Sequence, residues 1–139
     1  MSRPETRAAL DTSVVMRLLT GQPQDLAEAA RQYLAEVEKS GAKVFVSNLV
    51  VLEAYFACQH HYGMPKAAVL AGLHTLLSMP TLIVHPYLLP LLAAEGLASA
   101  KSDFPDRLIH AEASAARLPL VTFEKAAGRL PFTHLLKVP

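Results

Sequence analysis

Four of the twelve acidic residues lie in apolar or strand-end surroundings rather than on polar helix faces. Asp11 follows the strand-like stretch RAAL, and Glu53 lies within LVVLEAYFA. Asp106 opens DRLIHAEA, and Glu124 comes directly after PLVTF. Burying an unpaired carboxylate is costly, so acids at such positions need a neutralising partner. Their placement indicates a site rather than packing.

The residue types at these positions favour a metal site. Several carboxylates gathered at one place repel each other unless a cation neutralises them. A hard divalent ion such as Mg²⁺ prefers oxygen ligands and keeps several of its waters. We therefore expect an acidic quartet made of Asp11, Glu53, Asp106 and Glu124 to hold such an ion. Two nearby hydroxyl residues are expected to orient the carboxylates, namely Ser13 and Thr122.

Two alternatives stay open beside the quartet. Asp103 lies three residues before Asp106. It fits best as a helix cap that accepts a backbone N–H, but it competes as the acid that completes the cluster. Thr12 or Ser13 fits equally well as the cap of the helix that follows Asp11.

The elements that must position these acids alternate between short branched strands and longer helices. Strands are predicted over 7–11, 43–47, 81–85 and 119–123, with a last edge strand over 133–139. Helices are predicted over 12–21, 23–41, 47–63, 65–79, 86–102 and 104–118, with a helical turn over 124–130. This alternation predicts one α/β domain over 1–139, with a central parallel sheet of four to five strands and helices on both faces. Ligand sites of such sheets lie beyond the carboxyl ends of the strands, where the quartet falls.

The chain resembles a PIN domain, and in particular the VapC-type toxin ribonucleases of type II toxin–antitoxin systems. Four stretches carry the resemblance in order and spacing: ALDTSVVMRLL, VFVSNLVVLEAYFA, DFPDRLIHAEA and LPLVTFEKAAGRL. By position, Asp11, Glu53 and Asp106 match the three core acids of the family. Glu124 stands where the family usually has Asp, in a TFD context that reads TFE here.

The resemblance implies an endoribonuclease that hydrolyses phosphodiester bonds of RNA with Mg²⁺ or Mn²⁺ held by the quartet. A bound metal ion lowers the pKa of its water and offsets charge on the phosphate. The resemblance also implies an antitoxin protein as partner and a homodimer. Three cations near the motifs are candidate contacts for RNA phosphates, namely Arg17, Arg107 and Lys125.

Composition fits these expectations without proving them. The chain has 139 residues and a net charge of +1, which neither favours nor excludes nucleic acid. Cys58 is the only cysteine, so no internal disulfide and no multi-cysteine zinc site can form. Hydrophobic residues make up 52%, which predicts apolar surface covered by partners. The apolar runs are too short to span a membrane, and the opening MSRPETRAALD is unlike a signal peptide, so we expect a cytoplasmic location.

Two other function classes remain to be weighed. A PIN-like module that acts through protein contacts, with weak or no nuclease activity, is the alternative that the Glu at position 124 favours. A nucleotide-binding α/β domain needs a glycine-rich phosphate loop after the first strand. The sequence there is LDTSVV, without glycine, which argues against that class.

Overall fold

The computed structural model describes residues 4–139, and it is an α/β structure with six helices and parallel strands. The strands are β1 (Thr6–Ala9), β2 (Lys43–Phe45), β3 (Leu82–Ile83), β4 (Leu120–Thr122) and β5 (Thr133–Leu135). The helices are α1 (Thr12–Thr20), α2 (Gln24–Lys39), α3 (Asn48–His60), α4 (Lys66–Leu77), α5 (Leu88–Leu92) and α6 (Phe104–Ala115). Two 3₁₀ turns, η1 (Leu97–Ser99) and η2 (Ala127–Arg129), complete the order.

The strands form two separate sheets. β1, β2 and β3 make a parallel sheet in that spatial order, with Ala9 opposite Phe45 and Phe45 opposite Ile83. β4 and β5 make a second parallel sheet of two strands, with Val121 opposite His134. The predicted single sheet of four to five strands is therefore wrong: the sheets have three and two strands.

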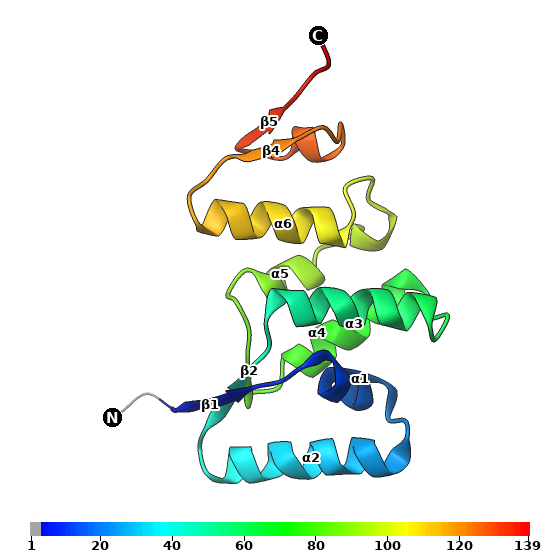
Figure 1. Ribbon diagram of the computed structural model, residues 1–139, viewed down its shortest axis with the longest axis vertical. Helices are drawn as coiled ribbons and strands as arrows, with labels where there is room; N and C mark the ends of the chain where they lie inside the picture. The colour runs from blue at the N-terminus through cyan, green and yellow to red at the C-terminus, as the bar shows by residue number, and fades with distance from the viewer. Residues whose placement is uncertain (1–3) are drawn as a thin grey trace.

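The molecule is elongated along one axis, and the two sheets lie at different places along that axis (Figure 1). α2 lies at one end, followed by β1 with α1, then α3 with α4 and α5, then α6, and finally β4 with β5. α6 therefore carries the last two strands away from β1 instead of returning them beside it. Local sequence patterns predict each strand but do not specify which sheet edge it joins.

The core explains why the larger helices form where the sequence predicts them. In α2 the buried residues recur at helical spacing: Ala27, Ala30, Leu34 and Val37. α3 begins at the cap Ser47, whose hydroxyl accepts the Val50 N–H, and α1 ends at Gly21 with a φ of 69°. Tyr55, Leu73 and Phe104 are among the largest fully buried side chains, so α3, α4 and α6 share one core.

The predicted elements come out shorter than expected. The helix expected over 86–102 is only α5, which ends at Leu92, and the chain then turns at Gly96 with a φ of 74° before η1. The last strand ends at Leu135 rather than at residue 139. Within residues 4–139, no helix combines the length and apolar character that a membrane crossing requires.

Candidate active site

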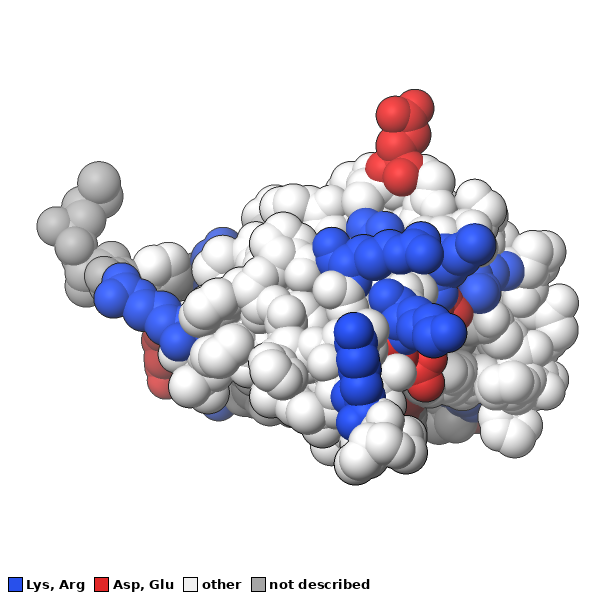
Figure 2. Space-filling view, turned by 90° about the horizontal axis from the view of Figure 1, so that it is seen from above, with Lys and Arg blue, Asp and Glu red and all other residues white. Residues whose placement is uncertain are grey.

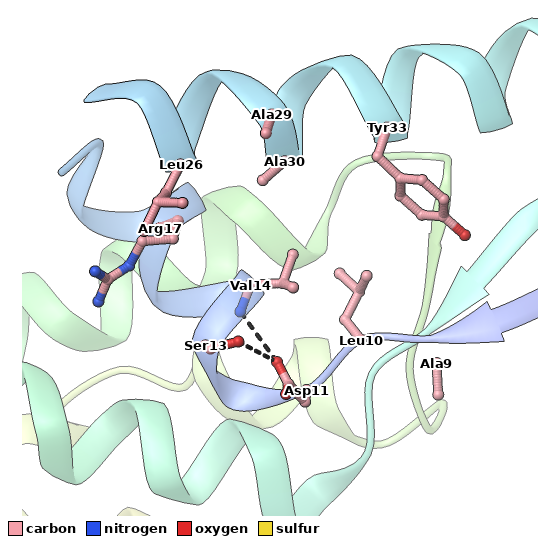
Figure 3. A pocket seen from close by; sticks show the side chains of 10 residues that line it. All are labelled: Ala9, Leu10, Asp11, Ser13, Val14, Arg17, Leu26, Ala29, Ala30 and Tyr33. Carbon is pink, nitrogen blue, oxygen red and sulfur yellow. Dashed lines mark hydrogen bonds between the residues drawn. The ribbon is translucent and has the colours of Figure 1, made fainter. Parts of the chain in front are cut away.

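Asp11 lies in the junction between β1 and α1, where it caps the helix. Its carboxylate accepts the Ser13 hydroxyl at 2.6 Å and the Val14 N–H at 3.2 Å (Figure 3). The cap of α1 is thus Asp11 itself, and the expectation that Thr12 or Ser13 takes this role is wrong. The Ser13 bond, followed by the Val14 bond, holds the pKa of Asp11 below its usual range.

The Asp11 carboxylate is exposed rather than buried. Two hydrogen bonds and the positive end of the α1 dipole stabilise its charge there. The residue therefore costs the fold little, and its charged form is available for a cation arriving from solvent. The predicted contact of Ser13 with this carboxylate is present.

The other three acids of the quartet lie on different elements. Glu53 is on an exposed position of α3, and Asp106 is half-buried in the first turn of α6. Glu124 follows β4 and is exposed, and its backbone N–H donates to the Thr122 hydroxyl at 3.0 Å. Thr122 thus shapes the turn that carries Glu124, while its predicted action on a carboxylate stays a prediction.

The acidic quartet has the right donor chemistry for a hard divalent ion, because all four groups are carboxylates. Across residues 4–139, however, no three His, Cys, Asp or Glu side chains are arranged so that they could hold a metal ion. Asp11 follows β1, whereas Glu124 follows β4 in the other sheet at the far end of the molecule (Figure 1). A single chain in this arrangement does not form the predicted metal site.

Asp103 is the cap of α6, as the sequence analysis predicts. Its carboxylate accepts the Phe104 N–H at 2.7 Å, the Tyr55 hydroxyl at 3.1 Å and the Lys66 ammonium at 2.9 Å. Partial burial alone raises the pKa of Asp103, but the Lys66, Phe104 and Tyr55 bonds outweigh it and lower the pKa. Burial of the Tyr55 hydroxyl, together with the neighbouring Asp103 charge, raises the pKa of Tyr55 to about 12.

A second polar contact, not foreseen from the sequence, joins α3 to the other end of α6. The buried Asn48 amide donates to the Tyr87 hydroxyl at 2.6 Å and to the Glu112 carboxylate at 2.8 Å. An asparagine one residue after a serine cap was the available signal, but its partners are 39 and 64 residues away. Together with Asp103, this contact fixes α6 along α3.

The comparison with protein families settles which group the chain represents. A model described as "PIN: PIN domain" matches residues 8–132, which is most of the chain. The chain belongs to the PIN domain family. No curated protein and no solved structure matches it. PIN domains are generally nucleases, which are hydrolases, and they typically use divalent metal ions.

The candidate phosphate-binding cations of this PIN domain differ in how freely they can move. Arg107 Nε donates to the Ser102 carbonyl at 2.9 Å, and Arg17 donates to the Tyr62 hydroxyl at 3.3 Å. Lys125 is exposed in the turn after β4. Viewed from the β5 end, Lys and Arg side chains gather around a few carboxylates (Figure 2). Their contact with RNA stays a prediction.

An apolar groove opens beside Asp11, between β1 with α1 and the length of α2 (Figure 3). Its volume is about 710 Å³. The side chains that line it include Leu10, Val14, Leu26, Ala30 and Tyr33, with Asp11, Ser13 and Arg17 as its polar members. Leu26 and Tyr33 are 51% and 37% exposed, so this PIN domain leaves an apolar surface of α2 uncovered next to its first acid.

Proposed function

We propose that the protein is a metal-dependent endoribonuclease that hydrolyses phosphodiester bonds of RNA with Mg²⁺ or Mn²⁺. The observation that carries the proposal is the PIN family match over residues 8–132 together with carboxylates at all four motif positions. Hard oxygen donors suit these ions, and carboxylates at these four positions give a metal-dependent nuclease the ligands it requires.

In this proposal Asp11, Glu53, Asp106 and Glu124 would hold the metal, and the bound ion would supply positive charge opposite the reacting phosphate. Ser13 keeps the Asp11 carboxylate oriented through its 2.6 Å bond. Arg17, Arg107 and Lys125 would contact neighbouring phosphates of the RNA strand. None of these cations reads a base edge in this scheme.

We further propose that the nuclease is the toxin of a toxin–antitoxin pair. The uncovered apolar groove beside Asp11 supports a protein partner, since a helix or extended segment can lay apolar side chains into such a groove. A partner seated there also blocks the approach of RNA to Asp11.

Cleavage of a pool of single-stranded and structured RNAs tests the nuclease. We expect cleavage by the full chain with Mg²⁺ or Mn²⁺, none with EDTA, and none by Asp11→Asn. That variant is well matched, because an asparagine oxygen can accept the same Ser13 and Val14 bonds and so keeps the cap while removing the charge.

Asp25→Asn is the control for a general effect of charge, because Asp25 is an exposed acid in the first turn of α2. It should leave cleavage unchanged. If no folded variant, wild type included, cleaves any RNA with either metal, the proposal is wrong and the protein-binding module becomes the better account. Cleavage that survives Asp11→Asn removes Asp11 from the site.

A further inference from the structure

The three-stranded sheet has an open edge at β1. Within residues 4–139, β1 pairs only with β2, so its other side has no strand partner in this part of the chain. The Leu10 N–H donates to the Phe45 carbonyl at 2.9 Å, toward β2. Because successive N–H groups of a strand point to opposite sides, the Ala9 N–H faces the open edge. An open edge of this kind is a template for another strand.

The last part of the chain carries the complementary edge. We call residues 116–139, which contain β4, η2 and β5, the C-terminal arm. Leu120 N–H donates to the Phe132 carbonyl, and Leu136 N–H donates to the Thr122 carbonyl, so β4 bonds β5 through its first and last residues. The backbone of Val121, between them, therefore faces away from β5, along an edge that is also open.

The C-terminal arm has no core of its own. Ala127 is its only buried residue, while its apolar side chains are exposed: Leu118 59%, Val121 56%, Phe123 68%, Phe132 57% and Val138 85%. Parallel sheets are found with both faces covered, and an isolated sheet of two strands is marginal in water. The arm is thus a strand pair that lacks the sheet and the layer of helices it requires.

The arm of one chain is poorly placed to reach its own β1. α6 is held in place by Phe104 and Leu108 in the core, and at its two ends by the bonds of Asp103 and Asn48. Only residues 116–119 separate α6 from β4, so the chain between Ala115 and Leu120 spans at most about 18 Å when fully extended. α3 lies between α6 and β1 (Figure 1), and each packed helix layer adds about 8–10 Å.

We propose that two copies of this chain exchange their C-terminal arms, with β4 of each copy pairing in parallel beside β1 of the other. Each half of the dimer then has a five-stranded sheet in the order β3-β2-β1-β4-β5, with no open edge on β1 or β4. Each copy gives one arm and receives one arm, so two copies satisfy both surfaces and form a symmetric dimer.

The pairing also brings together two members of the acidic quartet, Asp11 and Glu124, and this part of the inference rests on the proposed function. Asp11 lies two residues beyond Ala9, the end of β1, and Glu124 lies two residues beyond Thr122, the end of β4. With Ala9 opposite Thr122 of the partner subunit, both acids leave the same edge of the sheet.

A cysteine pair tests the exchange without any activity. Ala9→Cys and Thr122→Cys are introduced together in a Cys58→Ala background, since Cys58 is the only native thiol. Residues paired in adjacent strands are close enough for a disulfide. We expect mild oxidation to give a covalent dimer of twice 15.0 kDa, and neither single variant to do so. A disulfide within one chain, free thiols in the folded protein, or equal crosslinking of a single variant overturns the proposal.

Val121→Pro and Val121→Thr form the matched pair for the strand edge. Proline removes the Val121 N–H from the open edge and leaves intact the hydrogen bonds that Leu120 and Thr122 make to β5. Threonine keeps the N–H and the branched side chain. Light scattering should give twice 15.0 kDa for wild type and Val121→Thr, and 15.0 kDa for Val121→Pro. A monomeric wild type, or a dimer unaffected by proline, contradicts the exchange.

Mixed dimers separate this inference from the proposed function. Asp11→Asn and Glu124→Gln, each inactive alone, are refolded together. In an exchanged mixed dimer one site has both changes and the other has neither, so cleavage should return to about a quarter of the wild-type rate. No recovery beside an active wild type refutes the exchange and keeps the nuclease. An inactive wild type that still forms the disulfide dimer refutes the nuclease and keeps the exchange.

Discussion

Asp103 and Asp106 are three residues apart at one end of α6, but only Asp103 is tied into the fold by hydrogen bonds, whereas Asp106 is proposed to hold the metal. Substitution of each by asparagine should therefore have different effects. Asp103 accepts three hydrogen bonds, from Phe104, Tyr55 and Lys66. Asp106 has no hydrogen bond of its side chain within the described residues. We expect Asp103→Asn to weaken the fold and spare RNA cleavage, and Asp106→Asn to spare the fold and abolish cleavage.

The magnitudes follow from what each change removes. Asparagine at 103 keeps the cap and one acceptor oxygen but loses the charge opposite Lys66. Both side chains of that pair are 33% exposed, so solvent screening limits the loss of unfolding free energy to about 1 kcal/mol. Asp103→Ala also removes the cap and leaves the Tyr55 hydroxyl without its acceptor, for a total of about 3 kcal/mol. Asp106→Asn loses only a favourable charge near the N-terminus of α6, less than about 1 kcal/mol.

Urea unfolding followed by circular dichroism measures the stabilities, and RNA cleavage with Mn²⁺ measures the activities. The pH dependence gives an independent check. Because the pKa of Asp103 is lowered in the folded protein, its contribution is present above the usual value of 3.8 and is lost as pH falls through the lower folded value. The unfolding free energy of Asp103→Asn should therefore fall less than that of the wild type as the pH is lowered through this range. Stable but inactive Asp103→Asn, or unstable but active Asp106→Asn, refutes this assignment.

Three further outcomes test the local physics. Asp11→Ala should cost about 1 kcal/mol in urea unfolding, because it removes the cap of α1, whereas Asp11→Asn should cost much less. Arg117→Gly should raise the unfolding free energy by about 1 kcal/mol, because Arg117 is exposed with a φ of 60° at the end of α6. Because Tyr55 is buried and its folded pKa is about 12, against an ordinary value of 10.0, the wild type should lose about 2–3 kcal/mol as pH rises through that window. Tyr55→Phe should lose less over the same window, as measured by unfolding at each pH.

Local signals predicted the individual elements well. Ser47 and Asp103 as caps, Gly21 as a helix end and the apolar spacing of α2 each act over a few residues, so the sequence alone reveals them. The predicted cap of α1, Thr12 or Ser13, lies one or two residues after the actual cap, because Asp11, Thr12 and Ser13 are three good capping residues in a row. Only the backbone geometry distinguishes them.

Long-range pairing is where the prediction from sequence fell short. The segment PLVTF has the pattern of a buried parallel strand, and β4 is indeed parallel, but to β5 alone. The residues of this segment do not determine whether β4 pairs with a strand of the same chain or with a strand of another chain. The same limit applies to Asn48, whose burial depends on Tyr87 and Glu112 far along the chain.

The exposed apolar side chains of the C-terminal arm connect the shape of the fold to its chemistry. If the arm is exchanged, the acids at the ends of β1 and β4 meet only in the dimer, so a metal ion held by both stabilises the dimer over separate chains. By the same linkage, dilution separates the two chains and so breaks up the site that they share. Metal binding and RNA cleavage then both depend on the equilibrium between separate chains and the dimer. Cleavage per chain should accordingly fall with dilution in wild type and fall less in the disulfide-linked dimer.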